Sequence, residues 1–187
     1  MDSTTEVVLK NLEATQHDFW NISRATANFL NMMIKIVNAK NVVEVGTSNG
    51  YSGIWLAKAL KETGGHLTTI EYYEKRIVLA RENFKTCGVA DIIDIKQGSA
   101  IDILEEIPQD EIIDFAFIDA NKAQYIDYYN IIDKHLKVGG IITADNITSH
   151  AEKVKPFVDA ISANPNYQVE ILDLPAGLLL ARKNNMT

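Results

Sequence analysis

Two acidic residues and an asparagine stand at the ends of two apolar segments. Asp119 follows the run from Ile113 to Ile118, and Asp145-Asn146 follows the run 141–144. If these runs are neighbouring parallel strands, the three side chains converge at one edge of the sheet. Two carboxylates and an amide oxygen are hard donors that suit Mg²⁺ or another octahedral divalent cation. Without a metal, a turn at Asp145-Asn146 and a helix cap at Asp119 would explain the same residues.

Lys122 lies three residues after Asp119, at the start of the next expected helix. A lysine beside a divalent cation gives up its proton more readily, because the positive neighbour disfavours its charged form. Such an amine can serve as a general base. On spacing alone, an ordinary surface lysine is the better interpretation.

A glycine-containing turn joins the first apolar strand, 42–45, to a helix that begins near Tyr51. Its glycines are Gly46, Gly50 and Gly53. Glycine allows close approach of a ligand to the backbone, and the free N–H groups of a helix N-terminus can bind an anionic group. The dinucleotide fingerprint requires glycine at the first, third and sixth positions, and counting from Gly46 the third is Ser48 and the sixth is Tyr51. The turn therefore predicts a small-ligand cradle but a poor pyrophosphate loop, and an ordinary tight turn remains the alternative.

Two further strand ends face the same predicted cleft. Glu71 ends the second strand, and an acidic residue at this distance beyond a glycine loop can accept hydrogen bonds from both ribose hydroxyls of an adenosine cofactor. The segment 98–100 follows the third strand and is expected to flank the adenine. A solvated charge at Glu71 is the simpler alternative.

Strands alternate with helices along the chain, which predicts an open, mostly parallel sheet covered on both faces. A short turn at 174–177 joins the last two strands, so one of them must run antiparallel to the rest. We expect a single domain over residues 1–187, with residues 1–40 as a helical N-terminal extension packed on it. The expected strands are 42–45, 66–71, 92–97, 113–119, 141–144, 167–172 and 178–181, and the expected helices are 5–20, 23–37, 51–63, 73–87, 99–107, 122–136 and 151–163.

Composition places the chain among globular proteins of a reducing compartment. The net charge is −7, with 47% apolar residues, 23% charged residues and one cysteine. The acidic balance and the lack of a basic run argue against nucleic acid as a partner. No stretch has the length and apolarity of a membrane span, and the N-terminal residues lack the pattern of a signal peptide. We therefore expect a cytoplasmic protein with no membrane partner.

Taken together, these motifs resemble the cation-dependent catechol and caffeoyl-coenzyme A O-methyltransferase family. The likeness covers roughly residues 23–182. The segments that carry it are 29–33, 38–41, Glu44-Val45-Gly46 through Gly50-Tyr51-Ser52, Ile118-Asp119-Ala120-Asn121-Lys122 with Tyr125, and Ala144-Asp145-Asn146.

The resemblance implies a fold, an activity and a set of site residues. The fold is the seven-stranded, Rossmann-like methyltransferase sandwich with a C-terminal antiparallel hairpin. The activity is methyl transfer from S-adenosylmethionine to a hydroxyl of a catechol-like small molecule, with Mg²⁺ bound by Asp119, Asp145 and Asn146 and with Lys122 as the base. The predicted cofactor-binding residues are Glu44, Gly46, Ser48, Gly50, Tyr51, Ser52, Glu71, Gly98, Ser99, Ala100 and Asp119. A homodimer is expected by analogy.

The sequence departs from the family pattern around the substrate. Only residues 147–150 separate Asn146 from the next helix, where plant members carry a longer insertion, and Ala176 stands where many members have an acidic residue. We expect an altered and more open substrate wall, which makes coenzyme A esters a doubtful substrate class. His150 could line the pocket or assist the base, but an exposed residue at a helix start is the better interpretation.

Three other functions remain open at this point. Related enzymes that methylate a modified uridine in tRNA share the motifs, but the acidic charge counts against that substrate. The failed dinucleotide spacing counts against a nicotinamide-dependent oxidoreductase. A non-catalytic cofactor-binding module needs neither a metal set nor a base.

Overall fold

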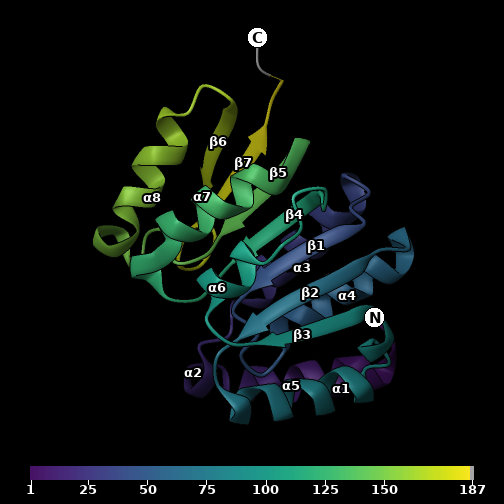
Figure 1. Ribbon diagram of the computed structural model, residues 1–187. Helices are drawn as coiled ribbons and strands as arrows, with labels where there is room; N and C mark the ends of the chain where they lie inside the picture. The colour runs from purple at the N-terminus through teal and green to yellow at the C-terminus, as the bar shows by residue number, and fades with distance from the viewer. Residues whose placement is uncertain (186–187) are drawn as a thin grey trace.

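A seven-stranded sheet forms the centre of the protein in the computed structural model, which describes residues 1–185 (Figure 1). The strand order is β3-β2-β1-β4-β5-β7-β6. The strands are β1 (Asn41–Val45), β2 (His66–Glu71), β3 (Ile93–Gln97), β4 (Ile113–Ile118), β5 (Leu136–Ala144), β6 (Tyr167–Leu172) and β7 (Leu178–Lys183).

Strands β1 to β5 are parallel, and β7 is antiparallel to both of its neighbours, β5 and β6. Strand order reverses at β1, which has β2 on one side and β4 on the other. The ligand cleft of an open parallel sheet lies at such a reversal, beyond the carboxyl ends of the strands. This arrangement confirms the predicted mostly parallel sheet with an antiparallel C-terminal hairpin.

Helices cover both faces of the sheet, as Figure 1 shows. Alternate strand residues point to opposite faces, so Val42 joins the core under the N-terminal helices and Val43 joins the core under the later helices. The first layer holds α1 (Ser3–Ala14), α3 (Arg24–Ile36), α4 (Tyr51–Thr63) and α5 (Glu74–Thr86), and the second holds α6 (Ala100–Glu105), α7 (Tyr125–His135) and α8 (Ala151–Ala163).

The N-terminal region contains a break that the sequence did not predict. In place of one helix over 5–20, α1 ends at Ala14 and a short α2 (Gln16–Phe19) follows. Trp20 then adopts a left-handed backbone with φ 53°, and the Asn21 side chain donates to the Leu12 carbonyl at 3.2 Å. The chain therefore turns back on itself, and residues 16–22 form a separate segment beside the glycine turn that follows β1.

The connection from α7 to β5 also differs from the prediction. The expected helix 122–136 begins as a 3₁₀ turn (Lys122–Gln124), and Leu136 already belongs to β5. Leu136 pairs with Ile113, and the register shifts before Phe115 pairs with Ile141. Gly139 and Gly140 therefore lie inside an irregular strand that starts five residues earlier than predicted (141 − 136).

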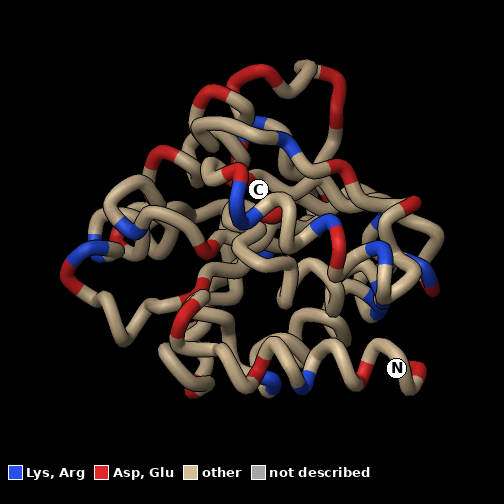
Figure 2. Tube along the Cα trace, turned by 90° about the horizontal axis from the view of Figure 1, so that it is seen from below, with Lys and Arg blue, Asp and Glu red and all other residues tan. Residues whose placement is uncertain are grey.

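Within residues 1–185, no helix is long and apolar enough to span a membrane. Lysine and arginine positions are distributed among aspartate and glutamate positions along the trace (Figure 2).

Candidate active site

A first cavity of about 490 Å³ opens at the carboxyl ends of β1 to β4. Nine of the predicted cofactor residues line it: Gly46, Ser48, Tyr51, Ser52, Glu71, Gly98, Ser99, Ala100 and Asp119. Residues from four separate strand ends therefore meet at one place, as the parallel topology requires. Glu44 and Gly50 were predicted to bind the cofactor but are not among the lining residues.

The glycine turn is held tightly against the neighbouring strands. The backbone N–H groups of Gly46 and Thr47 both donate to the Ile70 carbonyl, at 3.0 and 3.1 Å. Gly46 has φ +112°, and a Cβ atom there would lie 2.2 Å from the Asp119 carbonyl oxygen. Only glycine fits this position, because both the backbone angle and the space exclude a side chain.

Gly50 shapes the turn from behind the cavity. Its φ is +86°, and a Cβ atom would lie 2.7 Å from the Phe84 ring of α5. The residue allows the first turn of α4 to approach α5 closely. Its role in the structure is packing, which explains why it does not line the first cavity.

Glu44 lies beneath the turn, fully buried in β1. Its carboxyl accepts hydrogen bonds from the hydroxyls of Ser52 and Thr69, at 2.5 and 2.6 Å, and the Thr47 hydroxyl lies 2.6 Å from that of Thr69. Burial raises the pKa of Glu44 to about 7, against the lowering effect of the two hydroxyl donors. Glu44 therefore ties β1 to the start of α4 and positions the cavity wall without reaching the cavity.

Glu71 is held at the cavity wall by three backbone donors. One carboxylate oxygen accepts from the Ser48 N–H at 2.9 Å, and the other accepts from the N–H groups of Tyr72 and Tyr73 at 3.0 Å each. These bonds fix the side chain, and Oε2, which accepts only the Ser48 N–H, has capacity for a further donor. The geometry fits the predicted acceptor for ribose hydroxyls.

A second cavity of about 460 Å³ adjoins the first and contains Asp145 and Asn146. The backbone ladder brings the two strand ends together, since Asp119 N–H donates to Val45 O at 2.9 Å and Asp145 N–H donates to Ile118 O at 3.1 Å. Ala120, Asn121 and Lys122 line both cavities. A group bound in one cavity therefore lies beside a group bound in the other.

Asp145 carries the clearest sign of an additional ligand. It is 3% exposed, and its Oδ1 atom is buried without a hydrogen-bond partner. Burial and the nearby Asp119 charge raise the pKa of Asp145 to about 7, against the lowering effects of a backbone hydrogen bond at Asn146 and of the Lys122 charge. A buried carboxylate of this kind is normally paired or coordinates a cation. With Asp119 and Asn146 beside it, the donor set fits a hard divalent cation.

No group of three or more His, Cys, Asp or Glu side chains with metal-binding geometry occurs in residues 1–185. Asp119, Asp145 and Asn146 include an amide, so this set is of a different type. Asn146, two residues after the end of β5, has a left-handed backbone with φ 65°.

Lys122 pairs with Asp119 across the shared wall. Its Nζ atom donates to Asp119 Oδ1 at 2.8 Å, and both side chains are less than one-fifth exposed. The ammonium also lies 5.7 Å from the centroid of the Tyr125 ring. Lys122 is therefore positioned by partners within the site, unlike an ordinary surface lysine.

Sequence reasoning missed the part played by residues 16–22. Trp20, Asn21 and Ile22 line both cavities. The Ser48 hydroxyl donates to the Phe19 carbonyl at 3.1 Å, which joins this segment to the glycine turn. The sequence signals were the weak apolar pattern before Ser23 and the aromatic side chain of Trp20, and neither shows where the segment folds back.

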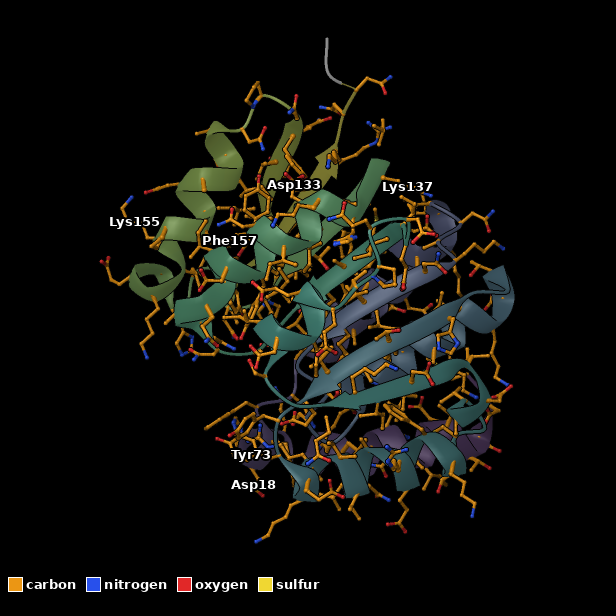
Figure 3. The ribbon with its side chains drawn as sticks, in the orientation of Figure 1. Asp18, Tyr73, Asp133, Lys137, Lys155 and Phe157 are labelled. Atoms are coloured by element: carbon orange, nitrogen blue, oxygen red, sulfur yellow. The ribbon has the colours of Figure 1, made fainter. Side chains whose placement is uncertain are left out.

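Arg76 and Tyr73 form a rim for the first cavity that was also missed. The Arg76 guanidinium lies 5.7 Å from the Trp20 ring centroid and 5.3 Å from that of Tyr73. Figure 3 labels Tyr73 next to Asp18 of α2, so the start of α5 and the 16–22 segment lie together at this edge. His150 is exposed at the start of α8, as predicted, and it also lines the second cavity.

The strand order, the antiparallel hairpin and the cavity at the strand ends define a class I methyltransferase. Comparison with known proteins gives the same class. The structure superposes on an O-methyltransferase from Bacillus cereus in complex with SAH with a TM-score of 0.87 and 28% identity, covering 98% of this chain and 92% of that one.

Sequence comparison identifies the family. Residues 2–184 match the sequence model of the O-methyltransferase family. Caffeoyl-CoA O-methyltransferase 1 of Arabidopsis thaliana is 33% identical over 196 aligned positions, covering 91% of this chain and 75% of that protein. Catechol O-methyltransferase of Niastella koreensis is 36% identical over 128 positions, covering 67% of this chain and 58% of that protein. The chain belongs to this family and is an S-adenosylmethionine-dependent O-methyltransferase.

Proposed function

We propose that the protein transfers a methyl group from S-adenosylmethionine to one hydroxyl of a catechol-like small molecule, with Mg²⁺ or a similar cation bound beside the substrate. The observation that carries the proposal is the buried, unpartnered Oδ1 of Asp145, which lies in a cavity adjoining the predicted cofactor cavity. A pure cofactor-binding module has no use for such an atom, since an unpaired buried carboxylate is costly.

The first cavity would hold the cofactor. Glu71 would accept the ribose hydroxyls, because its carboxylate is oriented by three backbone donors. The segment 98–100 would flank the adenine. Tyr51 and Ser52, in the first turn of α4, would contact the methionine end. In this orientation, the reactive methyl group would face Asp119 and the shared wall.

The second cavity would hold the cation and the substrate. Asp119, Asp145 and Asn146 would bind the ion. When bound, it supplies a Lewis acid that favours the ionised form of a hydroxyl and a template that orients two vicinal oxygens. The protein would hold the cofactor and the substrate close together, because Ala120 and Lys122 line both cavities.

Lys122 would accept the proton of the reacting hydroxyl. In the structure it donates to Asp119 Oδ1. With an ion bound by Asp119, this carboxylate would be shared between the ion and Lys122, and the amine of Lys122 would stand beside the reacting hydroxyl as its base.

Two substrate classes compete with a free catechol. The Arabidopsis relative is a caffeoyl-CoA enzyme by its name, but the segment 147–150 is short at the place where the family resemblance gives plant members a longer insertion. The tRNA alternative has no supporting observation in the structure. The cytoplasmic location and the homodimer stay predictions.

The test is methyl transfer from labelled S-adenosylmethionine to a panel of catechols, caffeoyl-CoA and bulk tRNA, with Mg²⁺ and with EDTA. Transfer to a catechol that EDTA abolishes and Mg²⁺ restores is the expected result. Cofactor binding with transfer only to tRNA would overturn the substrate class, and EDTA-insensitive transfer would overturn the metal assignment.

A further inference from the structure

The wall of the second cavity carries charge opposite to that of the whole chain. The chain has a net charge of −7. The charged and titratable residues that line this cavity are two lysines, two histidines and a single carboxylate: Lys122, Lys153, His17, His150 and Asp145. The adjacent acidic residues in the sequence, Asp18 and Glu152, are not among the lining residues.

The two lysines differ in their partners. Lys122 is neutralised by Asp119 at 2.8 Å. Lys153 takes part in none of the ion pairs found among residues 1–185, whereas Lys155, two residues further along α8, pairs with Asp159 at 2.7 Å. Lys153 is therefore the free cation of this wall. The single carboxylate, Asp145, is in turn assigned to the metal ion.

The start of α8 adds to the positive potential. His150 is the N-cap residue of this 13-residue helix, and its side chain makes no capping hydrogen bond. The unbonded N–H groups of a helix start carry a partial positive charge. His17 approaches the cavity from α2, so donors reach the cavity from two elements.

The second cavity has room for more than the aromatic ring of a catechol. The second cavity measures about 460 Å³, which is within the usual range for sites that bind whole drug-sized ligands. A catechol placed with its oxygens at Asp145 and Asn146 would leave space toward Lys153 and His150, and a substituent on the ring would enter that space.

We propose that this wall selects catechols that carry an anionic substituent, a carboxylate in the first instance, through Lys153 with His17 and His150. The inference rests on the proposed function, because it assumes that the hydroxyls occupy the Asp145 end. Lys153 is a specificity residue here and takes no part in the chemistry. A positive cavity in an acidic protein also attracts an anionic substrate from solution.

The test compares 3,4-dihydroxybenzoate with its methyl ester and with dopamine, an amine of similar size. The readout is the ratio of kcat/KM for the acid to that for the ester, so any general loss of activity cancels. We expect the acid to be preferred by about fivefold, the scale of one exposed charge pair, and the preference to fall at high salt.

Three variants make the test specific to one side chain. Lys153→Gln is expected to bring the ratio close to one, and Lys153→Glu is expected to favour dopamine over the acid. Lys155→Gln is the matched control, since Lys155 lies on the same helix, is exposed, and does not line the cavity (Figure 3). An unchanged ratio in Lys153→Gln, or an equal change in the control, would overturn the proposal.

A binding measurement separates this inference from the proposed function. Calorimetric titration of the acid and the ester into protein with Mg²⁺ and S-adenosylhomocysteine reads the charge preference without turnover. If none of the catechols, charged or uncharged, is methylated, the proposed function fails, while tighter binding of the acid that is lost in Lys153→Gln would still support the charge selectivity. Equal binding of acid and ester would refute the selectivity even in an active enzyme.

Discussion

Replacing the buried Glu44 with glutamine should change how stability depends on pH. The carboxyl is fully buried in β1, and its pKa is raised from 4.5 to about 7 by burial. Folding therefore favours the protonated form. The stability that this protonation provides is complete below pH 4.5 and is lost as the pH rises through about 7, because the folded state must then either keep a proton or bury a charge.

The magnitude follows from the two pKa values. With an unfolded value of 4.5 and a folded value of about 7, Glu44 should cost the wild type about 2.5 kcal/mol of unfolding free energy between pH 5 and pH 8. Glutamine has nearly the same shape and does not ionise. The difference in unfolding free energy, variant minus wild type, should rise by that amount over the same range.

Urea denaturation at half-unit pH steps measures this difference directly. Asp145 also has a raised pKa, but its contribution is common to both proteins and cancels. Glu152→Gln is the control, because it makes the same chemical change at an exposed position of α8. A constant difference for Glu44→Gln from pH 5 to pH 8 would refute the buried-carboxyl account.

Three other substitutions test separate parts of the site. Gly46→Ala should abolish cofactor binding or folding, as seen by calorimetry and circular dichroism, because its Cβ atom would collide with the Asp119 carbonyl; normal binding would contradict the described turn. Lys122→Ala should leave cofactor binding intact and lower kcat by about 10²–10⁴-fold, the usual contribution of a general base; persistent turnover would remove Lys122 from that role. Asp145→Asn should raise the melting temperature of the metal-free protein at pH 8 by a few degrees, because it removes a buried charge whose Oδ1 atom has no partner. The same substitution should eliminate the stabilisation by Mg²⁺. A variant that Mg²⁺ still stabilises would show that the ion binds elsewhere.

Local patterns were sufficient to predict the strand, turn and helix around Gly46. The apolar run, the glycines and the helical spacing are all short-range signals, and they specify a βα unit without further information. Because parallel strands end at one edge, the same reasoning brought Asp119 and Asp145 to adjacent positions, which the backbone bonds of these residues confirm.

Glu44 was predicted to bind the cofactor because it belongs to the motif that contains the glycine turn. That prediction did not consider whether each residue of the motif can reach the cavity. In a sheet covered on both faces every central strand residue is buried, so a glutamate in the middle of β1 had to lie in the interior. That signal was present in the sequence. The partner of Glu44 on β2, Thr69, was not visible in the sequence, because this contact depends on the register of β1 with β2.

The 16–22 segment could not be predicted from local patterns. Its shape depends on the left-handed turn at Trp20 and on long-range contacts, including the hydrogen bond from Ser48 to Phe19 and the stacking of Arg76 on Trp20. The spacing of apolar residues along the sequence carries no information about such long-range contacts. The early start of β5 is also a long-range effect. Leu136 pairs with Ile113 of β4, so the strand begins before Gly139 and Gly140, where the sequence predicted a turn.

The most direct test of the account is the dependence of methyl transfer on the divalent cation. Labelled S-adenosylmethionine and catechol should give methylated product with Mg²⁺, none with EDTA, and product again when excess Mg²⁺ is restored. Transfer that continues at the same rate in EDTA would contradict the assignment of Asp119, Asp145 and Asn146 as the metal site.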